Sequence, residues 1–224
     1  MKIILTCIIF ADLLIVTLGL LTAYNIHPSY TLGQLFDLRQ EFTVPTAYSG
    51  LKLGFLAALF SIVSLGAKDA SVTRVGIVWS LLVLFFALDE LGGIHERIAT
   101  IIDHRFPQSE TALKDAPVML RGFLAESLLA VPAVILALLS RPLFVHARGV
   151  RAQFLAGGVI FAGGAFVVDN FAKAFTNSIV FGELLEECLE FAGLTVMIAA
   201  AVRLLSLDPV TLTFGGQTQA AKAG

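Results

Sequence analysis

The chain has 224 residues, of which 57% are hydrophobic and only 14% are charged, and its formal net charge is −2. Such a composition excludes a soluble globular protein of ordinary make-up, and the absence of a basic surplus argues against a nucleic-acid partner. We therefore interpret the chain as an all-α, multi-pass membrane protein whose first partner is the lipid bilayer.

The N-terminal apolar run, residues 3–24, has about the ~20 residues that a bilayer span requires. It is longer than the apolar part of a signal peptide and lacks a small-x-small cleavage site, so we expect an uncleaved first transmembrane helix. Asp12 lies near its middle. Two interpretations stay open for this acid: a hydrogen bond to a neighbouring helix, or a link in a proton or ion path.

Residues 25–49 are more polar and contain Pro28 and Pro45. Four apolar positions in this loop are spaced as one face of a short amphipathic helix: Leu32, Leu35, Phe36 and Phe42. We expect the loop to lie on the membrane surface, over the polar side of the bundle.

Five further apolar runs are long enough to cross a bilayer with some tilt: residues 50–67, 75–102, 117–140, 153–175 and 181–205. With the first run they predict six transmembrane helices, joined by short connections into one domain over residues 1–205. The remainder, residues 206–224, is rich in Gly, Thr and Ala, and we expect a loose tail.

The distribution of Lys and Arg between the two sides predicts the orientation. Eight lie on the side of the termini (Lys2, Lys68, Arg74, Arg141, Arg148, Arg151, Arg203 and Lys222) and seven on the other (Arg39, Lys52, Arg97, Arg105, Lys114, Arg121 and Lys173). The connection between the fourth and fifth runs has three Arg and no acid near it. By the positive-inside rule we expect both termini in the cytoplasm.

Acidic residues gather at one depth, because alternation of six spans places the relevant helix ends on one side. Nine acids lie there: Asp89, Glu90, Glu96, Glu126, Asp169, Glu183, Glu186, Glu187 and Glu190. Three bases accompany them: Arg97, Arg121 and Lys173. The surplus of negative charge must be offset, and three solutions stay open: a bound metal ion, a proton-linked carboxylate cluster, or salt bridges.

Helical spacing selects the candidate metal ligands. On a continuous helix Asp89 and Glu96 share one face with Gly92 and Gly93, and the four glutamates of the last run fit within an arc of roughly 100°. The candidate ligands are Asp89, Glu96, Glu186 and Glu190, followed by Glu126, Asp169 and His95, the last either as a ligand or as a hydrogen-bonding neighbour of one. A histidine among carboxylates favours Fe, Mn or Zn over Mg or Ca.

A metal-dependent enzyme acting on a lipid or another membrane-soluble substrate is the first functional hypothesis. In it Glu90 or Glu187 serves as the general base, and Arg121 or Lys173 holds an anionic head group. A cation- or proton-translocating protein and a non-catalytic subunit of a membrane complex are the alternatives. Whether the chain is an enzyme stays open.

Three segments together resemble a group of uncharacterised bacterial multi-pass membrane proteins. They are Leu35-Phe36-Asp37-Leu38-Arg39-Gln40-Glu41-Phe42-Thr43-Val44-Pro45-Thr46-Ala47-Tyr48-Ser49, the Leu88-Asp89-Glu90 and His95-Glu96 run, and Glu186-Glu187-Cys188-Leu189-Glu190-Phe191-Ala192-Gly193. The resemblance implies a bacterial inner-membrane protein in which the first loop belongs with the two acidic helices. It implies no activity.

Overall fold

The computed structural model describes residues 2–26, 29–37, 43–94, 131, 133–144, 147–168 and 179–207. The regular structure in these ranges is helical: α1 (Lys2–Ala23), α2 (Tyr30–Leu35), α3 (Val44–Gly66), α4 (Ala70–Gly92), the 3₁₀ turn η1 (Arg141–Phe144), α8 (Arg148–Ala162), the π-helical η2 (Gly163–Val168) and α10 (Ile179–Leu207). Four segments of the described chain are long and apolar enough to cross a membrane, namely α1, α3, α4 and Leu184–Leu207 of α10. These four helices are the candidate spans of a membrane protein.

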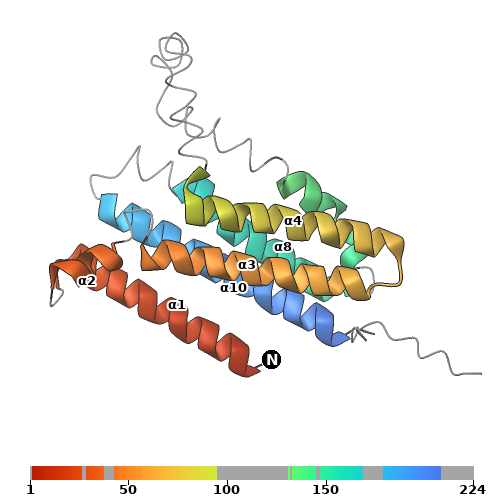
Figure 1. Cartoon of the computed structure of the whole chain (residues 1–224), viewed down its shortest axis with the longest axis horizontal. Helices are drawn as coiled ribbons and strands as arrows, with labels where there is room; N and C mark the ends of the chain where they lie inside the picture. Colours follow the sequence, from red (N-terminus) through yellow and green to blue (C-terminus); the bar gives the residue numbers. More distant parts are fainter. Residues whose placement is uncertain are drawn as a thin grey trace, which may run out of the picture.

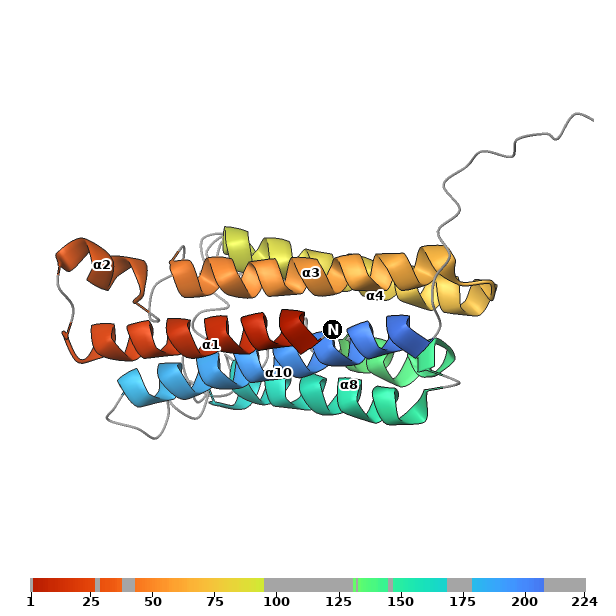
Figure 2. The ribbon, with the colours of Figure 1, turned by 90° about the horizontal axis from the view of Figure 1, so that it is seen from below.

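The bundle is built from two closely packed helix pairs, α3 with α4 and α8 with α10 (Figures 1 and 2). Helix α3 also packs against α10, and α1 lies along the outside, mainly against α10. Helix α1 is the least buried of the four candidate spans, and its outward side chains are large and apolar. Such a surface suits contact with lipid.

An aromatic cluster joins the two helix pairs. Phe60 of α3 stacks on Trp79 of α4 with ring centroids 5.7 Å apart, and both rings meet Phe154 of α8 edge-on at 5.4 and 5.1 Å. Phe144 of η1 stacks on Phe154 at 5.5 Å. Trp79 is buried and is thus a packing residue between the helix pairs.

Helix α3 begins at Val44, whereas the sequence predicted its span from residue 50. The reason is Pro45, which the sequence reading placed in a loop. Proline fits the first turn of a helix, because its missing N–H would have no partner there and its fixed φ is already helical. The first loop is correspondingly shorter than expected, and its helix α2 has only six residues.

Helix α4 ends at Gly92, ten residues before the predicted limit of its span. Gly93 adopts the left-handed conformation (φ 54°, ψ 43°), and its N–H donates to the Asp89 carbonyl at 2.7 Å. This is a glycine C-cap. The left-handed conformation would cost a residue with a Cβ about 1–2 kcal/mol. The expectation of one continuous helical face from Asp89 to Glu96 is therefore wrong.

The other two predicted spans are described in part. Residues 133–139 are helical, and the rest of the run 117–140 lies almost entirely outside the described ranges. Helix α8 begins at Arg148, five residues before the predicted start, and continues directly into η2. Helix α10 agrees with its predicted span to within two residues at each end. The six-helix prediction is therefore tested only in part.

Candidate functional site

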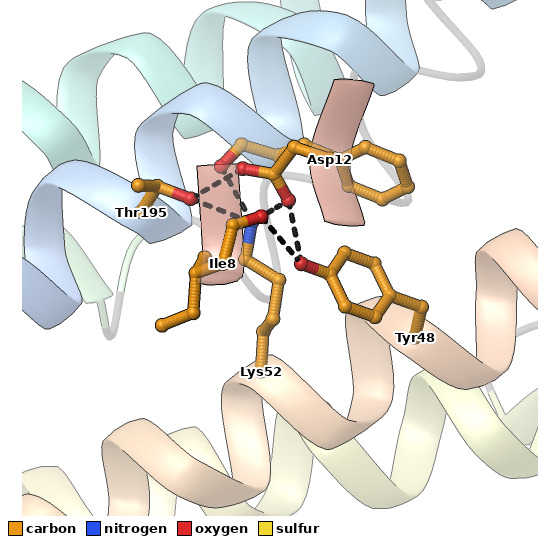
Figure 3. A network of polar contacts seen from close by, with 6 residues as sticks. Ile8, Asp12, Tyr48, Lys52 and Thr195 are labelled. Carbon is orange, nitrogen blue, oxygen red and sulfur yellow. Dashed lines mark hydrogen bonds and ion pairs between the residues drawn. The ribbon is translucent and has the colours of Figure 1, made fainter. Parts of the chain in front are cut away.

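A buried polar network joins α1, α3 and α10 in the middle of the bundle (Figure 3). Lys52 of α3 and Asp12 of α1 form an ion pair, with Nζ 2.7 Å from Oδ1. The same ammonium group donates to the Thr195 hydroxyl and to the Phe191 carbonyl of α10, both at 2.8 Å. All three N–H bonds of this buried lysine, whose side chain is 4% exposed, therefore have acceptors.

The Asp12 carboxylate is satisfied by the same neighbours. Its Oδ2 accepts from the Thr195 hydroxyl at 2.6 Å, so that Thr195 accepts from the lysine and donates to the aspartate. The Tyr48 hydroxyl of α3 lies 2.8 Å from Oδ1 and 3.1 Å from the Ile8 carbonyl, and its single proton serves one or the other. Two opposite charges and their hydrogen bonds thus form a closed set between three helices.

Two aromatic rings complete the surroundings of the ammonium group. Its Nζ lies 5.3 Å from the Tyr48 ring centroid and 5.2 Å from that of Phe191, and the two rings meet edge-on at 5.4 Å. Ring faces attract a cation, and they exclude water from the pair. Of the two interpretations of Asp12, the structure shows the hydrogen-bonded one: its carboxylate fastens α1 to α3 and α10.

Sequence reasoning singled out Asp12 but missed Lys52 and Thr195. Lys52 was counted among the bases that report orientation, although it lies inside α3 and is buried. A lysine and an aspartate that both interrupt apolar runs are candidates for pairing, because each alone is costly in hydrocarbon. That signal pointed to the pair, whereas nothing in the local sequence marks Thr195.

The described acids lie close to this network along α10. Glu190 directly precedes Phe191, whose carbonyl binds Lys52, and Glu186 and Glu187 lie one turn before it. On the other side of α3, a Cβ added at Gly50 would lie 2.6 Å from Leu91 of α4. Gly50, which contacts α4, and Lys52, which contacts α10, are separated by about 3 Å along the axis of α3. The end of α4 and the acidic part of α10 therefore lie at nearly the same depth.

The π-helical segment η2 reaches the same level. A Cβ added at Gly164 would lie 2.8 Å from the Glu186 carbonyl and 3.2 Å from Cγ of Glu190. Only a residue without a side chain allows this approach of η2 to α10. Short π-helical insertions occur frequently at functional sites. The ends of α4, η2 and α10 that the sequence predicted to share one side thus lie at one end of the bundle (Figure 1).

Five predicted site residues fall in the described chain. Asp89 is buried in the last turn of α4 beside Glu90, and Glu186, Glu187 and Glu190 are half-buried on α10. Each takes part in further interactions within the chain. The other predicted site residues lie outside the described ranges: His95, Glu96, Arg121, Glu126, Asp169 and Lys173. The described residues alone contain no group of three His, Cys, Asp or Glu that could hold a metal ion, so the full predicted set is untested.

Comparison with known proteins identifies a family without identifying an activity. Residues 6–205 match the family described as "Domain of unknown function (DUF8692)". Neither the curated proteins nor the solved structures gave a significant match. The match covers the long helices of the bundle except the first four residues of α1 and the last two of α10.

Proposed function

We propose that the chain carries a carboxylate-rich site near one membrane face. The site binds a divalent cation and acts on a lipid or another membrane-soluble substrate. The chain belongs to this family of unknown function, so the proposal is argued from its own residues. The observation that carries the proposal is the common depth of Asp89 and Glu90 on α4 and Glu186 and Glu190 on α10. Carboxylates crowded at one depth repel, and a cation relieves the repulsion.

The chemistry of the donor set suits this role. Carboxylate oxygens bind hard and borderline divalent ions, and with His95 in the set Fe, Mn or Zn is favoured over Mg or Ca. We further propose Glu96, Glu126 and Asp169 as ligands. Such an ion would activate water or polarise a substrate oxygen.

The remaining charged residues have roles around that centre. Glu90 or Glu187 removes a proton from the reacting group, and Arg121 or Lys173 binds an anionic head group. Lys52 lies one turn further into the bundle, where its bond to the Phe191 carbonyl holds α10 next to Glu190. The ion pair therefore has a positioning role and is not itself part of the reaction.

Six spans and cytoplasmic termini, in the inner membrane of a bacterium, belong to the same proposal. The burial of Lys52 supports this orientation, because an ion-paired lysine inside the bundle no longer counts as a charge in a loop. The balance of eight bases against seven then becomes eight against six. The positive-inside rule thus favours the side of the termini more clearly than the sequence count did.

The Glu190→Gln variant tests the cation. This substitution removes one charge and one ligand from α10 while keeping the side-chain shape. Elemental analysis of protein purified without chelator should show stoichiometric Fe, Mn or Zn in the parent and less in the variant. Chelator should lower the melting temperature of the parent and have a smaller effect on the variant, because a bound ion stabilises only the folded state.

Asp69→Asn is the matched control. Asp69 is exposed at the opposite end of the bundle, where it caps α4, and Asn is an equally good cap. We expect its metal content and chelator response to equal those of the parent. Equal metal content in the parent and in Glu190→Gln would remove Glu190 from the site, and a metal-free parent would refute the cation altogether.

A further inference from the structure

The end of the bundle opposite the acids carries a concentration of positive charge. We define this basic end by the described bases at the start of α1, the α3–α4 turn, η1, the start of α8 and the end of α10: Lys2, Lys68, Arg74, Arg141, Arg148, Arg151 and Arg203. All are exposed except Arg151, which is half-buried. The basic end is formed by elements that are far apart in sequence, so folding brings its charges together.

Packing contacts bring the start of α4, η1, the start of α8 and the end of α10 to the same end of the bundle. Arg203 of α10 donates to Gln153 of α8 at 2.7 Å, which puts the end of α10 beside the first turns of α8. Arg141 and Asp69 line the same shallow hollow, which places η1 beside the start of α4. Lys2 lies on the same side of the Asp12–Lys52 network as these bases, because it starts α1, ten residues before Asp12, and α1 runs antiparallel to α10 (Figure 1).

Asp69 is the one acid among the described residues at this end. Its carboxylate accepts from the Ser71 N–H at 2.7 Å and from the Ser71 hydroxyl at 2.8 Å. These hydrogen bonds lower the pKa of the Asp69 carboxyl, with a smaller contribution from Arg74. The acid is thus engaged as the cap of α4, whereas seven described bases lie in the same part of the bundle.

We propose that the basic end binds the head groups of anionic phospholipids. The observation that selects a lipid is the pairing of exposed bases with exposed leucines at the same level. Leu65 (74% exposed) lies one turn before Lys68, Leu139 (59%) lies two residues before Arg141, and Leu207 (63%) lies one turn after Arg203.

A phospholipid has the chemistry to satisfy both groups at once. Its phosphate accepts hydrogen bonds from the guanidinium groups, and its acyl chains cover the leucines that would otherwise meet water. An acidic soluble protein or a nucleic acid would satisfy the charges and leave those leucines exposed. The head-group layer is also where the ends of membrane-spanning helices lie.

To test the proposal, the full-length protein in detergent is titrated with phosphatidylglycerol or with phosphatidylcholine of identical acyl chains. Native mass spectrometry then measures how many lipid molecules are bound. The parent should bind phosphatidylglycerol more tightly, and added salt should weaken this preference. A variant with Lys68→Gln, Arg141→Gln and Arg148→Gln should bind phosphatidylglycerol more weakly by an order of magnitude or more. Each charge near an anionic surface contributes roughly fivefold to the affinity. Its affinity for phosphatidylcholine should not change.

The charge-conserving variant with Arg141→Lys and Arg148→Lys is the matched control and should keep the preference for phosphatidylglycerol. Should the triple variant fail to fold, Arg74→Gln with Arg203→Gln removes charge from the same end and should show the same loss. Equal binding of the two lipids by the parent would overturn the proposal, as would a neutralised variant that binds phosphatidylglycerol like the parent. Binding of an acidic peptide in preference to phosphatidylglycerol would also overturn it.

Discussion

At the scale of single residues, the ion pair of Asp12 and Lys52 explains how two charges persist in apolar helices. A charged side chain at the centre of a bilayer costs about 2.5–3.5 kcal/mol on insertion scales. Here both charges find a counter-ion, and their remaining hydrogen-bonding capacity is met by Thr195, Tyr48 and the Phe191 carbonyl. The pair thereby ties α1, otherwise weakly buried, to the rest of the bundle.

Removing one partner of this pair should cost more than removing both. Asp12→Leu leaves the Lys52 ammonium buried without its counter-ion, so we expect the free energy of unfolding to fall by ~3–5 kcal/mol. Asp12→Leu combined with Lys52→Met replaces both charges by apolar groups and should recover much of this loss. Denaturant unfolding of the three proteins in detergent measures the difference. Losses that simply add in the double variant would show that the two side chains do not stabilise one another.

At the scale of helices, α8 and α10 pack through glycines. A Cβ added at Gly193 would lie 2.5 Å from the Phe161 backbone nitrogen and 2.7 Å from the Gly157 carbonyl. The helices therefore approach one another through backbone contact, as small residues permit in membrane bundles. This contact lies on α10 between Phe191 and Thr195, both of which bind Lys52. Helix α10 is thus fixed by α8 and by α3 within the same turn.

Gly193→Ala should separate α8 from α10 and lower the free energy of unfolding by about 1–3 kcal/mol, because the added methyl group has backbone atoms in its way. Gly54→Ala on α3 is the matched control. A Cβ there meets nothing within 4 Å, so the variant should be as stable as the parent or slightly more stable through its better helix propensity. Thermal unfolding in detergent distinguishes the two, and equal stability of both variants would contradict the close packing.

The helices that the sequence predicted best are those with uninterrupted apolar runs. Helices α1 and α10 begin and end within two residues of their predicted limits. The largest errors lie at Pro45 and Gly93, because each residue type occurs in two kinds of local structure: proline in loops and in first turns of helices, and glycine within membrane helices and at their ends. The hydropathy of the sequence does not distinguish these local structures, whereas the backbone conformation does.

The candidate site also has features that the sequence predicts and features that it does not. The common depth of the acids on α4 and α10 follows from the alternation of spans and could be predicted. The pairing of Lys52 with Asp12, 40 residues away, is indicated only by the fact that both interrupt apolar runs, and the bond of Lys52 to Thr195, 143 residues away, could not be predicted. Which residues meet across three helices depends on their relative rotation and register, and one sequence contains no direct record of either.

At the scale of the whole molecule, charge is segregated along the bundle axis. The acidic end contains Asp37, Asp89, Glu90, Glu186, Glu187 and Glu190, and the opposite end contains the seven bases of the basic end. A membrane-inserted bundle with such an arrangement has a preferred orientation, since basic residues are retained on the cytoplasmic side. The basic end, with both ends of the described chain, should then face the cytoplasm.

Labelling with a membrane-impermeant maleimide tests this orientation in intact cells that express the protein. Cys7→Ala and Cys188→Ala remove the two native thiols, and one new cysteine is then introduced at an exposed position at either end. Tyr30→Cys on α2 reports the acidic end, and Asp69→Cys in the α3–α4 turn reports the basic end. We expect Tyr30→Cys to react in intact cells and Asp69→Cys to react only after the membrane is permeabilised. The reverse pattern would place the bases outside and would contradict the orientation, while labelling of both positions in intact cells would mean that the bundle does not separate its two ends across the membrane.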